Sequence, residues 1–155
     1  MKKRVAEFKK ISKIDEVSSF YDDIKLPLRS TSHSAGYDFF MPYDVVIKPS
    51  ETVKILTGIR VKMEDNYVLM IFPRSSLGIK HKLTLDNTVA IIDADYYNAL
   101  NEGHIMLSLT NHSDHDVILN KGDRFVQGIF LEYGITYYDD VDKDRIGGFG
   151  STNNQ

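Results

Sequence analysis

The sequence of 155 residues contains no cysteine, which excludes disulfide bonds, thiol catalysis and cysteine-ligated metals. It also lacks a long apolar run, because the longest one, Val68 to Phe72, is far too short to cross a bilayer as a helix. The basic stretch at residues 1–10 has no apolar core of a secretory signal. The formal net charge is -3, so stable binding of nucleic acid has no electrostatic basis. We therefore expect a cytoplasmic protein that stably binds neither membranes nor nucleic acids.

Short runs of β-branched, aromatic and alternating apolar residues recur along the chain, separated by turn-forming residues. Helical patterns are few: a helical turn is predicted at residues 75–80, and residues 12–23 fit either a short helix or a loop. This pattern is typical of an all-β fold, either a sandwich or a jelly-roll-like barrel. The predicted strands lie at residues 5–11, 45–47, 52–62, 67–72, 83–92, 105–109, 117–119 and 125–133.

One β-rich domain is predicted for residues 1–136, followed by a C-terminal stretch of different composition, residues 137–155. This stretch has few core-forming residues and contains a glycine-rich run, which predicts a mobile arm. Glycines let a backbone approach phosphates closely, and Arg145, Ser151 and Thr152 add hydrogen-bond donors. Phe149 offers a flat face on which a base is able to stack. The alternative interpretation is a disordered glycine-rich tail.

An acid follows directly after an apolar strand pattern in the segment Ala90 to Tyr96. In a strand, Asp93 and Asp95 share one face and Tyr96 lies on the other, unless a hairpin or bulge turns Tyr96 back toward Asp93. A carboxylate at this place is a candidate general base if burial or hydrogen bonding tunes it. Two solvated turn aspartates are the alternative.

Three further segments carry groups suited to phosphates or metals. Arg74, Ser75 and Ser76 stand where a strand enters a helical turn, and free backbone N–H groups with an arginine form an anion site. Asp38 lies at the mouth of a strand, where an acid can help to hold Mg²⁺ through water. Gln127 lies on a later strand, with an amide able to reach a phosphate oxygen. Taken singly, each segment also fits a capped turn, a turn aspartate or a polar strand edge.

Together these segments resemble the five motifs of the homotrimeric dUTPases, in the same order and with similar spacing, from about Leu26 to Thr152. The motifs read AGYDF, PRSSLGIK, AIIDADYY, GDRFVQGIF and RIGGFGST in this chain. The resemblance implies a β-clip subunit, which is a distorted jelly-roll barrel, and a homotrimer with active sites at subunit contacts. It also implies Mg²⁺-dependent hydrolysis of dUTP to dUMP and pyrophosphate, which excludes uracil from DNA and supplies dUMP for dTMP synthesis.

The resemblance also implies roles for single residues. Asp93 resembles the general base, Tyr96 the residue beneath the deoxyribose, and Asn87 the asparagine of the hairpin that binds uracil. Asp38 resembles the acid near the water shell of the metal, and Arg124 is expected to pair with acidic groups near the site. The remaining matches are phosphate contacts or parts of an arm that closes over the nucleotide, with Phe149 on the uracil and Arg145 near the γ-phosphate: Arg74, Ser75, Ser76, Gln127, Arg145, Phe149, Ser151 and Thr152.

The chain departs from the family pattern at several places. Ala90 replaces the usual glycine, Arg145 is one residue closer to the glycine run, and about five extra residues lie within 97–104, where we expect a longer surface loop. One alternative function is that of the related dCTP deaminases, which carry a catalytic glutamate where this chain has Ser108. A second alternative is a regulator that binds a protein partner under the control of a nucleotide, with residues 97–104 as one contact surface.

Overall fold

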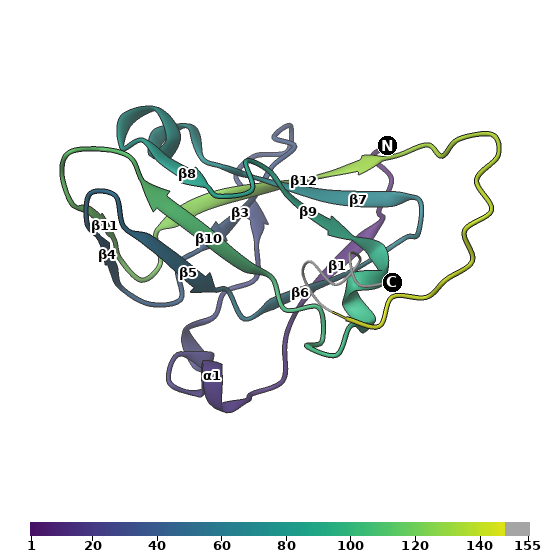
Figure 1. The fold of residues 1–155 in the computed structure, drawn as a ribbon, viewed down its shortest axis with the longest axis horizontal. Coiled ribbons are helices and arrows are strands. Elements are labelled where there is room, and N and C mark those ends of the chain that lie inside the picture. The colour runs from purple at the N-terminus through teal and green to yellow at the C-terminus, as the bar shows by residue number, and fades with distance from the viewer. Residues whose placement is uncertain (148–155) are drawn as a thin grey trace.

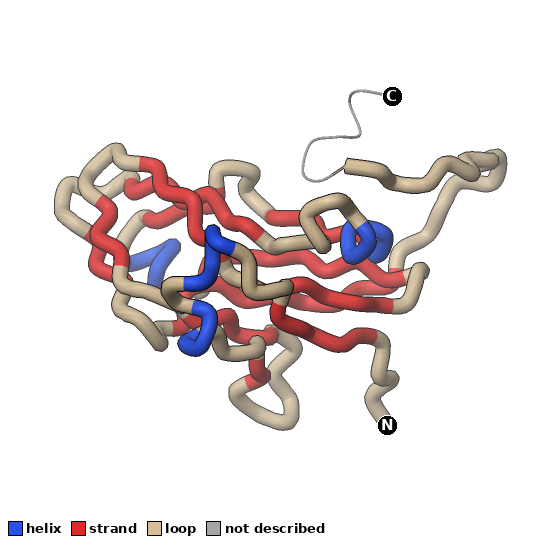
Figure 2. The backbone as a smooth tube through the Cα atoms, turned by 90° about the horizontal axis from the view of Figure 1, so that it is seen from below, coloured by secondary structure: helices blue, strands red, loops and turns tan. Residues whose placement is uncertain are grey.

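The computed structural model describes residues 1–147, and its strands form two packed layers with little helix (Figures 1 and 2). The larger sheet has the strand order β2-β3-β12-β7-β9 and is antiparallel throughout. Its strands are β2 (Leu28–Arg29), β3 (Tyr37–Phe40), β12 (Arg124–Glu132), β7 (Tyr67–Pro73) and β9 (Ala90–Asp93).

A smaller antiparallel sheet with the strand order β5-β10-β8 forms the other layer. Two strand pairs, β1 with β6 and β11 with β4, close the sides. The bounds of these strands are β5 (Thr52–Leu56), β10 (Met106–Asn111), β8 (Leu83–Leu85), β1 (Ala6–Lys10), β6 (Ile59–Met63), β11 (Val117–Leu119) and β4 (Val45–Ile47).

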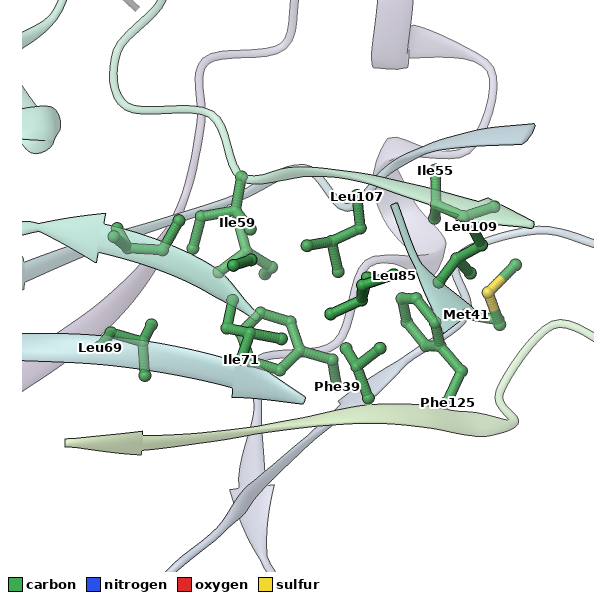
Figure 3. Close-up of a cluster of buried hydrophobic side chains, with 14 of the residues drawn as sticks. Phe39, Met41, Ile55, Ile59, Leu69, Ile71, Leu85, Leu107, Leu109 and Phe125 are labelled. Atoms are coloured by element: carbon green, nitrogen blue, oxygen red, sulfur yellow. The ribbon is translucent and has the colours of Figure 1, made fainter. Parts of the chain in front are cut away.

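The core fills the space between the two sheets, as Figure 3 shows. It is made by alternate side chains of the strands, because only every second residue of a strand faces inward. Phe39 and Phe125 are the largest fully buried side chains. Aliphatic residues from the opposing sheet pack on them, among them Ile55, Leu107 and Leu109.

The helical segments are short, and in residues 1–147 none is long and apolar enough to span a bilayer. They are α1 (Asp15–Ser18), η1 (Tyr21–Asp23), η2 (Ser76–Lys80) and η3 (Ala94–Asn98). The predicted turn at residues 75–80 is thus confirmed as η2, a single π-helical turn. Residues 12–23 combine the two predicted possibilities, because the short α1 and η1 are joined and flanked by loop.

Two predicted strands are each divided in the structure. Residues 52–62 form β5 and β6, separated at Gly58, which has a φ of +70° and packs closely against the Ile24 side chain. Residues 83–92 form β8 and β9, and the turn between them holds Thr88 at a φ of +66°. A positive φ is uncommon for a β-branched residue, so its composition does not predict this turn.

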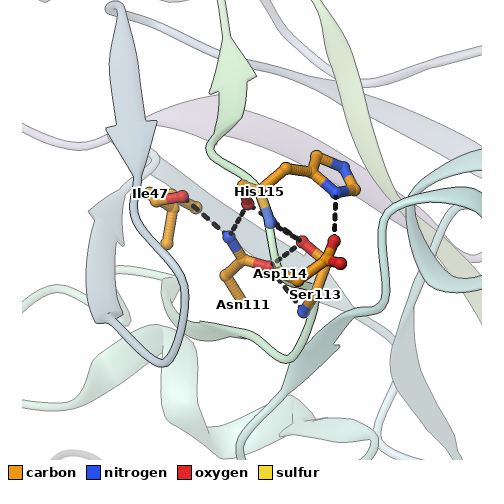
Figure 4. A network of polar contacts seen from close by, with 5 residues as sticks. All are labelled: Ile47, Asn111, Ser113, Asp114 and His115. Atoms are coloured by element: carbon orange, nitrogen blue, oxygen red, sulfur yellow. Dashed lines mark hydrogen bonds and ion pairs between the residues drawn. The ribbon is translucent and has the colours of Figure 1, made fainter.

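The turn after β10 is organised by one buried amide, Asn111 (Figure 4). Its Nδ2 donates to the carbonyl oxygens of Ile47 and His115, both at 2.8 Å. Its Oδ1 accepts from Ser113, from the backbone N–H at 2.9 Å and from Oγ at 2.6 Å. The buried amide is therefore hydrogen-bonded at both ends and joins β10 to β4.

After β12 the chain runs without helix or strand from residue 133 to 147. Figure 1 shows this segment extending away from the sheets and then turning back toward η3. Its aromatic side chains do not join the core, since Tyr137 and Tyr138 are fully exposed. The division at residue 136 and the mobility of the arm stay predictions.

Candidate active site

Asp38 lies at the centre of one polar cluster, at the end of the larger sheet where β3, β12 and β7 meet. Its side chain is only 8% exposed, and it is ion-paired with two arginines. Arg74 Nε lies 3.4 Å from Oδ1, and Arg124 Nη1 lies 3.3 Å from Oδ2. Ser30 Oγ donates to Oδ2 at 2.8 Å and accepts from Arg124 Nη1 at 2.8 Å. Two arginines and one acid leave a net positive charge, and both guanidinium groups remain partly exposed.

The side chains around this cluster are hydrogen-bond donors. Gln127 lies directly opposite Asp38 in the β3–β12 pair, so the two side chains share one face of the sheet. Its amide oxygen lies 2.5 Å from the position that a Cβ at Gly36 would take, so the Gln127 side chain packs directly against the backbone of Gly36. Ser75 and Ser76 are exposed and follow Arg74 directly, and Ser75 makes no side-chain cap bond to η2. The arrangement is suited to an anion with several oxygens.

Asp93 belongs to a second cluster, which lies where β9 ends. It is the last residue of β9, and η3 begins with the next residue, so the strand alternation predicted through Tyr96 ends here. Both acids nonetheless face the same side, as predicted, because Arg145 binds both. Arg145 Nη2 lies 2.6 Å from Asp93 Oδ2, and its Nε lies 2.8 Å from Asp95 Oδ1. The two carboxylates are about half exposed, whereas the Arg145 side chain is 12% exposed.

Tyr96 is buried beneath this ion pair. Its side chain is 3% exposed, and the Arg145 guanidinium lies 5.8 Å from the centre of its ring. Its hydroxyl donates to the His104 carbonyl at 2.6 Å and accepts from Asn101 Nδ2 at 2.8 Å. Burial raises the pKa of this hydroxyl, so it remains protonated near neutral pH.

Residues 97–104 leave η3 and continue as turns at the surface, as expected, but part of this segment packs inward. Leu100 is exposed, but Ala99 and His104 are buried against the body of the domain. His104 Nε2 accepts the backbone N–H of Gly58 at 2.9 Å. The inward packing of these residues was not predicted, because sequence length alone does not show which residues of an inserted segment face inward.

Asn87 lies in the exposed turn between β8 and β9, beside a cavity of about 290 Å³. The cavity is lined by Asn87 and by residues of β5 and β10, including Lys54, Met106 and Ser108. Asp86 secures the turn, because Ser108 Oγ and Thr110 Oγ1 both donate to its carboxylate. These two hydrogen bonds lower the pKa of Asp86.

The Asp38 cluster and the Asp93 cluster lie far apart in one chain. Asp93 is the register partner of Val68 near the start of β7, whereas Arg74 follows the end of the same strand. The six residue-to-residue steps from Val68 to Arg74 span roughly 20 Å in extended conformation. One chain therefore brings the predicted base to Arg145 but not to the predicted phosphate contacts of the Asp38 cluster.

The other site residues include three that the structure does not describe, one predicted ion pair and several partners that were not predicted. Phe149, Ser151 and Thr152 lie outside the described residues. Arg124 pairs with an acid, as predicted. Sequence reasoning missed Ser30, Asn101 and the bond of Asp95 to Arg145, because each partner is distant in the sequence and no motif spacing relates them.

The model of one protein family, dUTPase, matches residues 22–153 of this chain. The chain belongs to the dUTPase family. It is 42% identical to the deoxyuridine 5'-triphosphate nucleotidohydrolase of Lactococcus lactis, over 83% of this chain and 88% of that protein. A second relative with this name, from Psychrobacter arcticus, is 36% identical over 92% of this chain and 93% of its own length.

Solved structures agree with this assignment. The crystal structure of dUTPase from Streptococcus mutans superposes with a TM-score of 0.71 at 37% identity, and the match covers 83% of this chain and 97% of the other. The dUTPase of Staphylococcus aureus phage phi11 has the same fold, with a TM-score of 0.71 at 19% identity over 90% of this chain and 97% of the other. The predicted family, jelly-roll-like β fold and dUTPase activity are therefore confirmed.

Proposed function

We propose that this dUTPase acts as a homotrimer in which each active site combines the Asp38 cluster of one chain with Asp93 of another. The single observation that carries the proposal is the distance of roughly 20 Å between Arg74 and Asp93 within one chain, across six residues of β7. A base cannot act on a phosphate at that distance. A closed symmetric assembly supplies the missing half of each site from a neighbouring copy.

The Asp38 cluster is suited to binding the triphosphate of dUTP. Arg74 and Arg124 supply positive charge, and Ser75, Ser76 and Gln127 supply neutral donors. Asp38 holds both guanidinium groups in place before the substrate arrives, which lowers the entropic cost of binding. The same charges stabilise the negative charge that develops on the phosphate oxygens during the reaction.

Asp93 is suited to act as the general base. Its carboxylate is half exposed at the end of a strand and is able to accept a proton from water. The activated water attacks the α-phosphorus, the bond from this phosphorus to the bridging oxygen breaks, and pyrophosphate leaves. dUMP keeps the new oxygen.

The cavity beside Asn87 is a suitable place for uracil. An asparagine amide has both donors and an acceptor, which match the mixed pattern on the edge of uracil. A close fit there would exclude the methyl group of thymine. Tyr96 would pack under the deoxyribose, where its ring leaves no room for a 2′-hydroxyl. In the proposal, Arg145, which lies 5.8 Å from the centre of this ring, moves away before the sugar packs on it.

The described residues fit Mg²⁺ that arrives with the substrate. Within residues 1–147 there is no group of three or more His, Cys, Asp or Glu side chains able to hold a metal. Asp38 already bonds Ser30 and two arginines, so we assign it contact with the metal through water only. Mg²⁺ keeps several waters and binds phosphate oxygens, and when bound it neutralises charge on the triphosphate.

The arm would close each site over the bound nucleotide. In the proposal Arg145 moves from Asp93 to the γ-phosphate, Phe149 stacks on uracil, and Ser151 and Thr152 bond phosphate oxygens. Closure excludes bulk water and aligns the α-phosphate with the attacking water. The dCTP deaminase alternative lacks support, since Ser108 has no carboxylate and donates to Asp86.

Mixing two inactive variants tests the shared site. Asp93→Asn and Arg74→Ala chains are each inactive alone, but subunits exchanged by refolding a 1:1 mixture would restore about a quarter of the sites. Pyrophosphate release from dUTP with Mg²⁺ is the readout, and dCTP with ammonia detection tests the deaminase alternative. Absence of recovered activity from folded mixtures would contradict the shared site. Sedimentation should show a species three times the 17.7 kDa chain.

A further inference from the structure

We propose that Asn101 is a positioning residue that holds the ring of Tyr96, and that it thereby sets how strongly the enzyme rejects ribonucleotides. This inference rests on the proposed function of Tyr96 under the deoxyribose. Asn101 lies in the segment 97–104, which we refer to as the brace. Except for Tyr97, the last residue of the third motif, the brace lies outside the five family-like motifs, and it contains neither the proposed base nor the proposed phosphate contacts.

The first support is the bonding of the Tyr96 hydroxyl, which joins the ring to the middle of the brace at Asn101 and to its last residue, His104. The hydroxyl accepts from Asn101 Nδ2 at 2.8 Å and donates to the His104 carbonyl at 2.6 Å. Both distances are typical of good hydrogen bonds. The ring is therefore held at its far end as well as at its Cβ.

Asn101 is itself oriented by the brace. Its Oδ1 accepts the backbone N–H of Gly103 at 3.2 Å, which directs Nδ2 toward Tyr96. Gly103 has a φ of +71°, and a Cβ at this position would lie 2.5 Å from the Tyr96 carbonyl oxygen. The brace thus packs directly on the backbone of Tyr96, in a conformation that favours glycine.

The brace is also fixed to the body of the domain on two sides. Glu102 accepts from Ser12 Oγ at 2.8 Å, and Arg60 Nη2 donates to the Tyr97 carbonyl at 2.7 Å. The Arg60 guanidinium lies 3.6 Å from the centre of the Tyr97 ring. His104 is buried and bonds Gly58 on the other side. A segment with these attachments is able to resist displacement of the side chain that it holds.

In the proposal, rejection of UTP depends on how strongly the brace resists displacement of the Tyr96 ring. UTP differs from dUTP by one hydroxyl, and an apolar surface rejects an added hydroxyl only weakly when it is able to yield. A ring fixed at both ends cannot move aside without breaking the bonds to Asn101 and His104. The discrimination against a 2′-hydroxyl therefore depends on the hydrogen bonds of the Tyr96 hydroxyl as well as on the bulk of the ring.

The test compares kcat/KM for dUTP and UTP in Asn101→Ala and in the matched control Leu100→Ala, whose side chain is 85% exposed in the same segment. We expect the dUTP/UTP ratio to fall about 3- to 10-fold in Asn101→Ala, mainly because UTP turnover rises. The control should keep the wild-type ratio. A variant that only loses stability would lose activity on both substrates in parallel, and such a result would overturn the proposal.

Two Tyr96 variants separate failure of this inference from failure of the proposed function. Tyr96→Leu removes the ring, and an unchanged dUTP/UTP ratio would show that Tyr96 does not contact the sugar. If Tyr96→Leu loses discrimination and Asn101→Ala keeps it, only the role of Asn101 is refuted. Tyr96→Phe removes the hydrogen bonds of the ring to both Asn101 and His104 without changing a residue of the brace, so it tests the inference even if Asn101→Ala does not fold. In the Tyr96→Phe background, Asn101→Ala should cause no further fall in the dUTP/UTP ratio. Additive effects of the two substitutions would refute the coupling between Asn101 and Tyr96.

Discussion

Arg145 Nη2 lies 2.6 Å from Asp93 Oδ2, so the arm of the free chain binds the proposed general base. The guanidinium covers one oxygen of the carboxylate, and its Nε binds Asp95 in addition. A water molecule to be activated by Asp93 needs access to the same carboxylate. We therefore expect Arg145 to leave Asp93 when a triphosphate, with its higher negative charge, becomes available as a partner.

Substitution of the proposed base should separate binding from turnover. Asp93→Asn keeps the size of the side chain but removes the proton acceptor, so we expect kcat to fall by about 10²–10⁴-fold. Binding of a non-hydrolysable dUTP analogue, measured by calorimetry, should be retained. Turnover near that of the wild type would refute the assignment of Asp93.

Removal of the arm should abolish catalysis without unfolding the domain. A chain ending after Asp144 lacks Arg145 and the glycine-rich run, and residues 133–144 contribute no buried side chain to the core. We expect a folded trimer with little dUTPase activity, measured by circular dichroism, sedimentation and pyrophosphate release. A monomer would show that the arm is needed for assembly, and full activity would show that it is not a lid.

The Asp38 cluster should contribute to stability as well as to substrate binding. Asp38→Asn removes the charge between Arg74 and Arg124 and leaves the two guanidinium groups to repel each other. Because both arginines are partly exposed, we expect a loss of about 1–2 kcal/mol and a higher KM for dUTP. Thermal unfolding and initial rates measure the two effects. Asp116→Asn, at an exposed site, is a matched control and should change neither Tm nor KM. An Asp38→Asn protein with wild-type Tm and KM would contradict the role of Asp38 in stability and substrate binding.

His104 should make the domain less stable in mild acid. Burial lowers its pKa below the ordinary 6.5, and protonation of Nε2 would break its bond to Gly58 N–H. As the pH falls through 6.5, the unfolded chain binds more protons than the folded chain. The stability that neutral His104 contributes is therefore complete above pH 6.5 and is lost as the pH falls toward the lower pKa of the folded state.

The measurement is Tm between pH 7.5 and 5.5, a range in which ordinary carboxylates remain ionised. His104→Gln keeps an acceptor for Gly58 but has no proton to gain, so its Tm should fall less over this range. His33→Gln, at an exposed site, should keep the wild-type slope. Equal slopes in all three proteins would exclude His104 as the source of the acid sensitivity.

Most of the strands were predictable because the alternation of apolar residues is a local property of the chain. The predicted runs at residues 45–47, 67–72 and 117–119 agree closely with β4, β7 and β11. The two divided strands were not predictable in the same way, because Gly58 and Thr88 adopt positive φ values within segments of strand-like composition. Their conformations depend on tertiary packing, such as that of Ile24 against Gly58.

The sequence by itself determined the family and the kinds of chemical groups available, since five short motifs stand in the expected order and carry the acids, arginines and glycines of a dUTPase. Only the tertiary structure decided which groups meet. Asp38 binds Arg74 and Arg124, Arg145 binds Asp93, and Asn101 holds Tyr96, because strand register and burial bring together residues that are distant in the chain. The same register keeps Asp93 from Arg74, because the length of β7 lies between them.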